Sequence, residues 1–444
     1  MLNLLRKLIS QSLINTFWHY PLSIVANIIH LFPSKKLFLI GVTGTDGKTT
    51  TANLIYHLLQ NAGLKTALIS TISAKIGDTE LDTGLHTTSP DKFTIQKILH
   101  LMVKNKVKYA VLEVTAHALD QHRFQGCKFD ISILTNTSTE HLDYFKNMDN
   151  YIYTKSKLFL QSKLSILNKD DISYPIIGKL LKKKKKKFIT YGIKEKSDFQ
   201  AKKVKLDHKW LSFSINQNKL KTNSCYGYQA YNILTTFALA QQLKISPKIF
   251  AQTIKNFPPV KGRREELKIK KGIRSIIDYA HTPAALEATL SSLKKNKTHK
   301  TSALIVIFGA TGQRDKEKRP LMGKVVSKHA NIAIITSDDT RQENINDINK
   351  QIRQGIPIKT KLIKNNNPSK QEIKKIRQLA SKKFLFFDLP DRQDAFNLAI
   401  KLAQKGDTII ACGKGHEKTI LHGKTEYPWS EAEAFRTAFK LNKV

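Results

Sequence analysis

At residues 41–50 the sequence reads Gly-Val-Thr-Gly-Thr-Asp-Gly-Lys-Thr-Thr, between an apolar run at Lys36–Val42 and a helical pattern at Thr49–Asn61. Glycines allow a turn whose N–H groups face phosphate oxygens, and a helix N-terminus adds a favourable potential for an anion. In such a loop Lys48 reaches the terminal phosphates and the Thr49 hydroxyl holds Mg²⁺. Val42 stands where the usual Gly-x4-Gly-Lys-Ser/Thr loop has its first glycine. The stretch therefore predicts a variant nucleotide-phosphate loop between a strand and a helix.

The pattern around this loop predicts a parallel sheet covered by helices, because short apolar runs alternate with helical periods. A second pattern of the same kind follows the stiff break at Phe257-Pro258-Pro259. The expected strands are Lys36–Val42, Thr66–Ile72, Tyr109–Val114 and Asp130–Asn136 before the break, and Ser275–Asp278, Ser302–Phe308, Ile332–Thr336, Lys383–Phe387 and Thr408–Ala411 after it. Ligands of open α/β sheets bind beyond the carboxyl ends of the strands, so the chemistry is expected there.

The fold class is α/β. We expect a central P-loop-type parallel sheet ATPase domain, followed by a Rossmann-like α/β C-terminal domain. The expected boundaries are 1–35 for a short apolar N-terminal segment, 36–258 for the central domain and 259–444 for the C-terminal domain. A chain of 444 residues exceeds the roughly 250–300 residues at which single cores stop growing, so several domains are expected.

The composition excludes disorder as the main state, because 41% of the residues are hydrophobic and 25% are charged. The formal net charge is +40, but the lysines are spread along the whole chain, so we expect no nucleic-acid partner. The dense run Lys182–Lys187 is interpreted as a solvated loop or helix end. Three cysteines without paired spacing favour a reducing cytoplasm.

The N-terminal segment Leu2–Phe32 is apolar, but Lys7, His19, Pro21 and His30 interrupt it. No run reaches the about 18 residues that a spanning helix needs. An amphipathic helix is expected, and docking on the body of the protein is favoured over contact with a membrane.

Further motifs follow the loop in a fixed order. The blocks are Glu113-Val114-Thr115-Ala116-His117-Ala118-Leu119-Asp120-Gln121, Thr135-Asn136, His141-Leu142-Asp143-Tyr144, Tyr151-x3-Lys155-x2-Leu158-Phe159, Asp278-Tyr279-Ala280-His281-Thr282-Pro283, Phe308-Gly309-Ala310-Thr311-Gly312-Gln313-Arg314-Asp315-Lys316, Lys318-Arg319-Pro320-Leu321-Met322-Gly323 and Gly413-Lys414-Gly415-His416-Glu417. Together with the loop, this order resembles the Mur ligase superfamily from about Lys36 to about Phe439. It is most similar to the members that add the third residue of the peptidoglycan peptide stem.

The resemblance implies an ATP-dependent amide ligase of the acid–amino-acid type. Such an enzyme moves the γ-phosphoryl group of ATP to the terminal carboxylate of a UDP-N-acetylmuramoyl-dipeptide-like acceptor. The amine of a diamino acid then attacks the acyl phosphate, in peptidoglycan precursor synthesis. The implied cofactors are ATP and Mg²⁺, the implied partners are the muramoyl peptide and the amino acid, and the expected state is a monomer. A folylpolyglutamate-synthetase-like enzyme and a nucleic-acid-binding NTPase remain alternatives.

The resemblance also implies roles for individual residues. ATP is expected at Gly44, Thr45, Asp46, Gly47, Lys48, Thr49, Thr50, Asn232, Arg263, Asp278, Tyr279, His281, Arg314 and Lys316. Lys48, Glu113, His141 and Lys155 are the expected catalytic residues, and Thr49, Glu113, His141 and a carbamylated Lys155 the expected metal ligands. An unmodified Lys155 ammonium would repel the metal, so this assignment implies the modification. The acceptor is expected at Thr87, Thr88, Thr115 and Arg123.

The amino acid is expected at Asp338, Asp339, Arg341, Gly413 and Glu417. Members of the family that choose meso-diaminopimelate carry Asp-Asn-Pro-Arg, whose arginine can grip the distant carboxylate with two hydrogen bonds. This chain reads Asp338-Asp339-Thr340-Arg341 and keeps the arginine. Diaminopimelate is therefore favoured over lysine, and Glu417 is expected to meet the ammonium end.

The N-terminus departs from the family. Full-length members carry a UDP-binding domain before the ATP loop, whereas 40 residues precede Gly41 here, too few for a typical domain of about 100. Either uridine is recognised weakly or elsewhere, or the acceptor is not a UDP-sugar peptide. A membrane-bound acceptor is a further hypothesis.

Overall fold

A computed structural model describes residues 10–81, 89–207, 210–215, 218–223, 226–269, 272–296, 301–358, 360–363 and 365–442. The chain divides into two compact units. Unit 1 comprises Met1–Lys205, Leu211–Asn223 and Tyr228–Phe257, and unit 2 comprises Leu206–Trp210, Ser224–Gly227 and Pro258–Val444. The three-part division predicted from the sequence stays a prediction.

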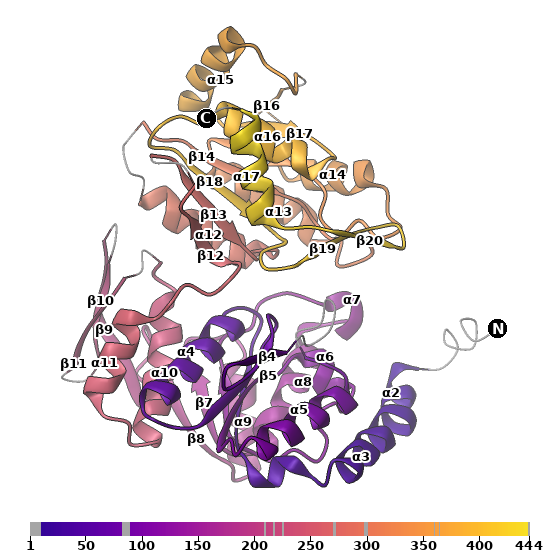
Figure 1. The fold of residues 1–444 in the computed structure, drawn as a ribbon, viewed down its shortest axis with the longest axis vertical. Coiled ribbons are helices and arrows are strands. Elements are labelled where there is room, and N and C mark those ends of the chain that lie inside the picture. Colours follow the sequence, from indigo (N-terminus) through magenta and orange to yellow (C-terminus); the bar gives the residue numbers. More distant parts are fainter. Residues whose placement is uncertain are drawn as a thin grey trace. The chain divides into compact units, whose positions relative to one another are not determined.

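Unit 1 is built on a mostly parallel sheet, as expected from the α/β pattern (Figure 1). Its described strands run in the order β11-β10-β9-β8-β7-β6-β1-β5-β2-β3-β4. They are β1 (Phe38–Thr43), β2 (Thr66–Ile69), β3 (Ala74–Ile76), β4 (Thr79–Leu81), β5 (Tyr109–Glu113), β6 (Phe129–Leu134), β7 (Ser162–Asn168), β8 (Lys187–Gly192), β9 (Phe199–Leu206), β10 (Leu211–Ile215) and β11 (Asn218–Thr222).

Helices pack on this sheet or on the helices that cover it. They are α2 (Gln11–Ile14), η1 (Asn15–His19), α3 (Tyr20–Ile29), η2 (Pro33–Lys36), α4 (Lys48–Asn61), α5 (Lys92–Lys104), α6 (Ala116–Asp120), α7 (Leu142–Phe145), α8 (Met148–Leu160), α9 (Tyr174–Lys183), α10 (Gln229–Gln242) and α11 (Pro247–Asn256). The central strand β1 is buried on both faces, which explains its continuous apolar sequence. Ile40 packs in the cluster that holds Leu54 of α4, whereas Leu39 packs in the cluster that holds Leu99 of α5.

Two expectations about this sheet were wrong in detail. The predicted strand Thr66–Ile72 ends at Ile69, because the Ser70 N–H donates to the Ser73 carbonyl oxygen at 3.0 Å and turns the chain into β3. The sheet is also not parallel throughout. Strand β3 pairs antiparallel with both β2 and β4, and β10 pairs antiparallel with β11. Short hairpins need no crossover helix, so a pattern of alternating strands and helices does not predict them.

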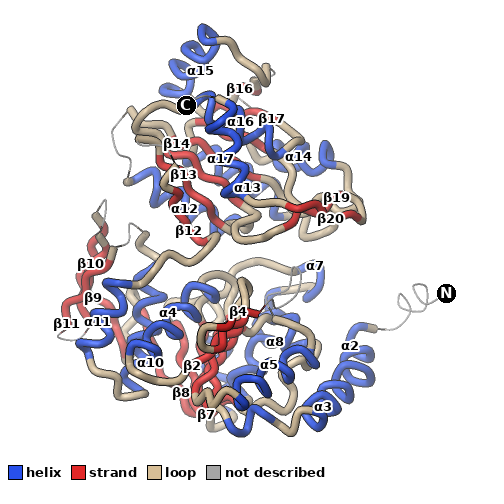
Figure 2. The backbone as a smooth tube through the Cα atoms, viewed as in Figure 1, coloured by secondary structure: helices blue, strands red, loops and turns tan. Residues whose placement is uncertain are grey.

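Unit 2 contains a second sheet with the described order β12-β13-β18-β14-β15-β17-β16 (Figure 2). Its elements are β12 (Arg263–Leu267), β13 (Arg274–Asp278), α12 (Pro283–Lys295), β14 (Leu304–Phe308), α13 (Lys318–His329), β15 (Ile332–Ile335), α14 (Ile345–Gln354), β16 (Lys361–Leu362), α15 (Lys370–Lys382), β17 (Leu385–Asp388), α16 (Arg392–Leu402), β18 (Thr408–Cys412), β19 (Thr419–His422), β20 (Thr425–Pro428) and α17 (Glu431–Leu441). Only β12 pairs antiparallel within the described part of this sheet, with β13. Strands β19 and β20 form a separate antiparallel hairpin, which the sequence patterns did not predict.

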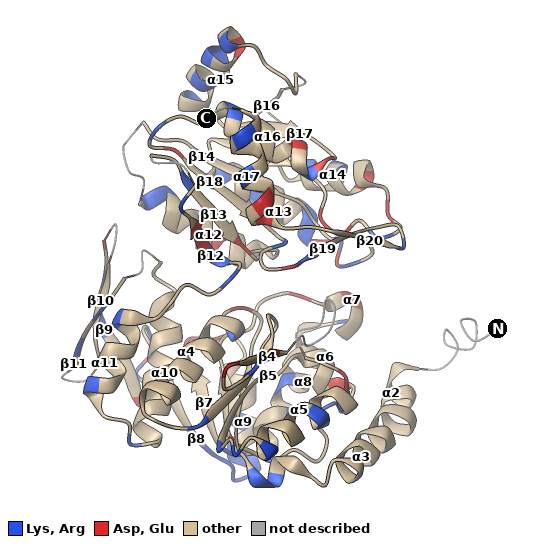
Figure 3. Ribbon diagram, in the orientation of Figure 1, with Lys and Arg blue, Asp and Glu red and all other residues tan. Residues whose placement is uncertain are grey.

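Basic side chains occur on many elements of both units rather than along one stripe (Figure 3). The lysine run Lys182–Lys187 spans the end of α9 and the start of β8, which confirms the expected helix end. Among the described residues, no helix is both long enough and apolar enough to cross a bilayer.

Candidate active site

The phosphate loop joins β1 to α4, and the end of β6 holds it in place. The Thr45 N–H donates to the Asn136 carbonyl oxygen at 2.8 Å, and the Asp46 N–H donates to Asn136 Oδ1 at 3.0 Å. Gly44 has a φ of +153°, and a Cβ atom there would lie 1.9 Å from Thr135 Oγ1. A residue with a side chain would therefore push the loop away from β6.

Lys48, the first residue of α4, folds its side chain back over this loop. Its Nζ donates to the carbonyl oxygens of Gly44 at 3.0 Å and Thr45 at 2.8 Å. The ammonium group and the N-terminus of α4 thus lie together, an arrangement that favours an anion. The phosphates of ATP are predicted to bind at this loop.

Asn232 of α10 lies beside the phosphate loop although it is far from it in sequence. Thr51 Oγ1 donates to Asn232 Oδ1 at 3.2 Å, and a Cβ atom at Gly47, whose φ is +82°, would lie 2.9 Å from the same oxygen. Gly47 therefore allows α10 to approach closely. Thr50, another predicted ATP-binding residue, is buried in the first turn of α4.

Glu113, at the end of β5, is a fully buried carboxylate surrounded by hydroxyl groups. It accepts hydrogen bonds from Thr49 Oγ1 at 3.0 Å, Thr71 Oγ1 at 2.8 Å and the Thr71 N–H at 3.0 Å. Carboxylate and hydroxyl oxygens are ligands that suit Mg²⁺. This chemistry fits the predicted roles of Thr49 and Glu113 as metal ligands. Thr71 was not identified from the sequence, because it stands in no matched block.

Lys155 of α8 is fully buried, which is unusual for a lysine. Its Nζ lies 3.9 Å from the centroid of the Tyr151 ring. Burial, with the nearby charge of Lys48, lowers the pKa of Lys155 to about 7, and Glu140 and Asp171 oppose the shift only in part. Near neutral pH, Lys155 is therefore a neutral amine in a large fraction of the molecules, whereas an ordinary lysine is charged.

His141 precedes α7 in a left-handed conformation, with a φ of +58°. Its Nε2 lies 3.5 Å from a Glu140 oxygen, and its ring centroid lies 4.6 Å from that of His117 and 6.3 Å from that of Tyr151. His141 and Lys155 thus share Tyr151 as a neighbour. Within the described residues, no three His, Cys, Asp or Glu side chains form a group that could hold a metal ion. The full predicted ligand set stays a prediction.

Thr115 and Arg123, predicted to contact the acceptor, lie together around Ser89. The Thr115 and Ser89 hydroxyl oxygens are 3.3 Å apart, and Arg123 Nη1 donates to the Ser89 carbonyl oxygen at 2.5 Å. Thr87 and Thr88 lie outside the described residues. The described part of this group is a compact polar cluster at the end of β5.

In unit 2, aromatic and charged groups gather around Tyr279. The Arg263 guanidinium lies 4.1 Å from the centroid of the Tyr279 ring, and Tyr279 Oη donates to Glu417 Oε1 at 3.3 Å. The ring of His281 lies 4.7 Å from that of Tyr279. Asp278, just before them, is buried, and burial raises the pKa of its carboxyl group.

Lys414 links the acidic residues that were predicted to bind the amino acid. Its Nζ donates to Asp339 Oδ1 at 2.7 Å, lies 4.0 Å from Asp338 Oδ1 and contacts Glu417 Oε2 at 2.5 Å. Burial by itself would lower the pKa of Lys414. The attraction of the carboxylates of Asp338, Glu417 and Asp339 is stronger, so the pKa is raised. Gly413, its predicted neighbour in the site, donates its N–H to the Asp278 carbonyl oxygen at 3.1 Å.

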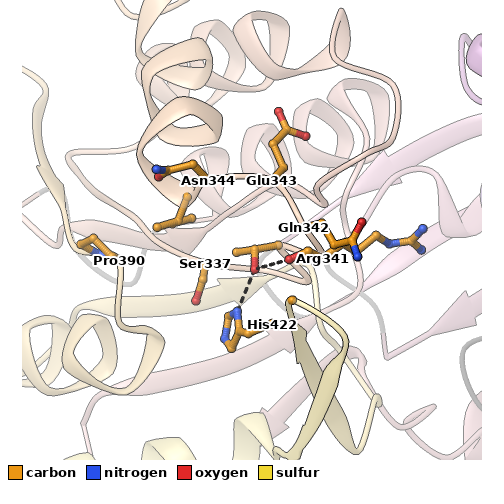
Figure 4. Close-up of a pocket in the computed structure, with 10 residues that line it drawn as sticks. Ser337, Arg341, Gln342, Glu343, Asn344, Pro390 and His422 are labelled. Atoms are coloured by element: carbon orange, nitrogen blue, oxygen red, sulfur yellow. Dashed lines mark hydrogen bonds between the residues drawn. The ribbon is translucent and has the colours of Figure 1, made fainter.

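A cavity of about 470 Å³ is lined by Thr340 and Arg341, which follow Asp338 and Asp339 in sequence (Figure 4). Thr340 Oγ1 lies 3.0 Å from His422 Nδ1 and donates to the Arg341 carbonyl oxygen at 3.4 Å. The Arg341 N–H donates to the Leu421 carbonyl oxygen, so the hairpin of β19 and β20 holds the backbone of the arginine. The lining residues are Ser337, Thr340, Arg341, Gln342, Glu343, Asn344, Ile345, Pro390, His422 and Gly423.

Comparison with known proteins decides the family. The Mur ligase middle domain matches residues 42–240, and the Mur ligase glutamate ligase domain matches residues 262–415. The chain belongs to the Mur ligase family. It is 36% identical to the UDP-N-acetylmuramoyl-L-alanyl-D-glutamate–2,6-diaminopimelate ligase of Caldanaerobacter subterraneus, over 92% of this chain and 79% of that protein. It is 37% identical to the enzyme of the same name from Aquifex aeolicus, over 91% of this chain and 78% of that protein.

Solved structures of Mur ligases share the fold. A UDP-N-acetylmuramoyl-L-alanyl-D-glutamate–2,6-diaminopimelate ligase matches with a TM-score of 0.61 and 24% identity, covering 97% of this chain and 83% of that one. The MurF ligase of Thermotoga maritima in complex with ADP matches with a TM-score of 0.62 and 16% identity, covering 94% of this chain and 84% of that one. The predicted lack of a UDP-binding domain in this Mur ligase stays a prediction.

Two of the predicted ATP-binding residues of this Mur ligase lie on an exposed loop between β14 and α13. Arg314 is exposed, and Lys316 Nζ lies 3.7 Å from Glu343 Oε1. The buried cation beside them is Arg319, whose Nη1 and Nη2 donate to the two oxygens of Glu343 at 2.6 and 2.9 Å. Their assignment to ATP stays a prediction.

Sequence reasoning missed several neighbours of the predicted site residues. Tyr151 and Lys414 stand inside matched blocks, so their position could have identified them. Glu140 and His422 stand outside the quoted blocks, and only the folded chain brings them to Lys155 and Thr340.

Proposed function

We propose that this Mur ligase joins a diamino acid, meso-diaminopimelate, to the terminal carboxylate of a UDP-N-acetylmuramoyl-dipeptide-like acceptor at the expense of ATP. The observation that carries the proposal is the phosphate loop, in which Lys48 lies over the loop and Thr49 joins it to the buried Glu113. The names of the relatives from Caldanaerobacter subterraneus and Aquifex aeolicus support the same reaction. We place this reaction in the cytoplasm, since the described cysteines, Cys127 and Cys412, are free thiols.

The reaction needs two steps, because hydroxide is a poor leaving group from a carboxylate carbon. In the first step an acceptor carboxylate oxygen attacks the γ-phosphorus of ATP, and ADP leaves. In the second step the amine of the amino acid attacks the carbonyl carbon of the acyl phosphate, inorganic phosphate leaves, and the amine loses a proton. The first step brings anions together, so cations and N–H groups must balance their charge.

The residues of unit 1 fit this requirement. Lys48 and the N–H groups of the loop would hold the terminal phosphates, and Thr49, Glu113, His141 and Lys155 would hold Mg²⁺. Bound there, Mg²⁺ would neutralise charge that develops on the phosphoryl oxygens. Thr71, which donates two hydrogen bonds to Glu113, would orient that carboxylate. Asn232 would keep α10 against the loop through Thr51.

Lys155 would act after carbamylation. Its neutral Nζ attacks the carbon of CO₂, the nitrogen loses a proton, and the resulting carbamate carries a negative charge. Two observations support this step: the side chain is buried, and its pKa is lowered to about 7. The change converts a group that repels a cation into one that attracts it.

The cavity beside Arg341 would receive the distal end of the amino acid. The Arg341 guanidinium would hold the distal carboxylate with two hydrogen bonds, and Glu417 would meet an ammonium group. Thr340 and His422, which lie 3.0 Å apart, offer further polar groups on the same cavity. Lysine lacks the distal carboxylate, so it would leave Arg341 without this partner.

A product assay tests the proposed reaction. Purified protein is incubated with ATP, Mg²⁺, UDP-N-acetylmuramoyl dipeptide and a mixture of amino acids, and the product is identified by mass spectrometry. We expect the acceptor to gain one diaminopimelate residue, with one phosphate released per bond. Phosphate release that DNA or RNA stimulates, without any peptide product, would reject the proposal in favour of a nucleic-acid-binding NTPase.

Replacing Arg341 with glutamine is expected to lower kcat/KM for meso-diaminopimelate about 10- to 100-fold, the value of charged hydrogen bonds. With free lysine as the substrate, we expect kcat/KM to change by about twofold or less. Glutamine is chosen because Arg341 has a φ of +51°, so the backbone strain is similar in both proteins. Steady-state kinetics with each amino acid measure the effect.

Gln342→Ala, at an exposed position that lines the same cavity, serves as the control. This variant should change kcat/KM for meso-diaminopimelate and for lysine by no more than about twofold. If Arg341→Gln lowers both values equally, Arg341 has a structural role and does not select the substrate.

A further inference from the structure

Large apolar side chains are exposed on the N-terminal helices of unit 1. Among the described residues, eight of the eighteen exposed large hydrophobic side chains lie between Leu13 and Leu31. Phe17 is 74% exposed and Trp18 is 64% exposed. The set, called here the N-terminal apolar face, is Leu13, Phe17, Trp18, Tyr20, Val25, Ile28, Ile29 and Leu31. Large apolar side chains that are exposed together in this way mark interaction sites.

The opposite side of these helices is polar and is fixed to the body of unit 1. Asn15 Nδ2 donates to Asp120 Oδ2 at 2.6 Å, and Asn27 Nδ2 donates to the Gln125 carbonyl oxygen at 2.7 Å. Asn15, Ser23 and Asn27 are all buried. The segment therefore docks on the protein body, as expected, but it does so through amides and small side chains. The eight large apolar side chains of the N-terminal apolar face point to solvent, whereas Ile14, Leu22 and Ile24 are half-buried.

The charge around this face is positive. The helices α2 and α3 carry no Lys, Arg, Asp or Glu (Figure 3), and no Asp or Glu occurs in the sequence before Asp46. Lys35 and Lys36 follow α3, and Lys97 and Lys104 are exposed on α5, the helix against which α3 packs. Two carboxylates on the elements next to these helices are engaged in hydrogen bonds: Asp120 binds Asn15, and Asp91 caps α5.

We propose that the N-terminal apolar face binds the surface of an anionic lipid bilayer. Aromatic and aliphatic side chains beside lysines are the composition of helices that lie in the membrane interface, where Trp and Tyr are favoured. A charge of +40 attracts a negatively charged surface. The same charge disfavours a second copy of this chain as the occupant, since two strongly cationic molecules repel each other. The helices lie on the membrane and do not cross it.

Vesicle flotation with the full chain tests this proposal. We expect the protein to float with vesicles of phosphatidylcholine and phosphatidylglycerol, and at least about tenfold less with phosphatidylcholine alone. The double variant Phe17→Ser/Trp18→Ser should lower the partition coefficient on the mixed vesicles by about tenfold or more. Both side chains are exposed, so the fold and the ligase activity on soluble substrates should persist.

The matched control is Ile358→Ser/Leu441→Ser, which removes exposed apolar side chains from unit 2, where they are 101% and 66% exposed. It should float like the unchanged protein. Equal loss in the control would mean that exposed apolar side chains bind the vesicles wherever they lie, and no loss in Phe17→Ser/Trp18→Ser would mean that the net charge alone drives binding. Either result would overturn the proposal. Absence of flotation with mixed vesicles would also overturn it. So would a dimer in sedimentation equilibrium that Phe17→Ser/Trp18→Ser abolishes, since a second copy would then cover the face.

Discussion

Replacing Lys155 with alanine is expected to lower the rate of peptide-bond formation by roughly 10²- to 10³-fold, the scale of losing one charge-stabilising group. Alanine cannot carry a carbamate, and it removes the buried amine beside Tyr151. The negative charge proposed to hold the metal would then be absent. The rates of product formation and of phosphate release are measured together. Their comparison shows whether the variant slows phosphoryl transfer or the attack of the amine.

The control is Lys157→Ala on the same helix. Lys157 is partly exposed and pairs with Asp120 at 3.4 Å, a contact worth little to activity, so a change of about twofold or less is expected. Isotope-labelled bicarbonate should give a carbamate signal in the unchanged protein and none in Lys155→Ala. Small carboxylic acids should partly restore the variant if they enter the vacated space. A fully active variant, or an unmodified Lys155 in active enzyme, would contradict the carbamate.

The pH dependence of this modification has a definite sign. Carbamate forms from the neutral amine, and its formation releases a proton. The pKa of Lys155 is lowered to about 7, so the amine loses its charge as the pH rises through this value. The carbamate signal at fixed CO₂ should therefore increase from pH 6 to pH 8, whereas an ordinary lysine would stay charged over that range.

Replacing Lys48 with alanine is expected to lower the rate about 10³-fold or more, because the variant loses the cation that lies on the proposed phosphate loop. It also loses the bonds from Nζ to the Gly44 and Thr45 carbonyl oxygens, so the loop is less firmly held. The lost charge has a second effect, since the charge of Lys48 lowers the pKa of Lys155. Lys48→Ala should raise that pKa and reduce the carbamate signal near neutral pH.

Lys65→Ala, an exposed position of unit 1, should leave both the rate and the carbamate signal unchanged. ATP binding measured by calorimetry separates binding from catalysis. If Lys48→Ala joins the amino acid at the normal rate, the phosphate loop has no part in the reaction and the proposed function fails.

Local sequence determined much of the fold of this Mur ligase. The apolar run Lys36–Val42 predicted a buried strand, and it became β1 with small shifts at its ends. The expected strands of the second half became β13, β14, β15, β17 and β18, with small shifts at their ends. These elements depend on neighbouring residues, so periodicity and turn residues were enough to identify them. The antiparallel edges depend on pairing with other strands, which periodicity does not report.

The motifs by themselves determined which residue types are available for the chemistry, and tertiary structure alone decided their environment. The sequence placed Lys48 on a phosphate loop because glycines and a helix start act locally. It could not show that Lys155 is buried against Tyr151 near Glu140, which sets its pKa, nor that Lys414 joins Asp339 to Glu417. The N-terminal sequence also did not predict that Asn15 and Asn27 face the protein, whereas the rings of Phe17 and Trp18 face solvent. Burial and charge at a side chain arise from residues distant in sequence, so only the folded chain fixes them.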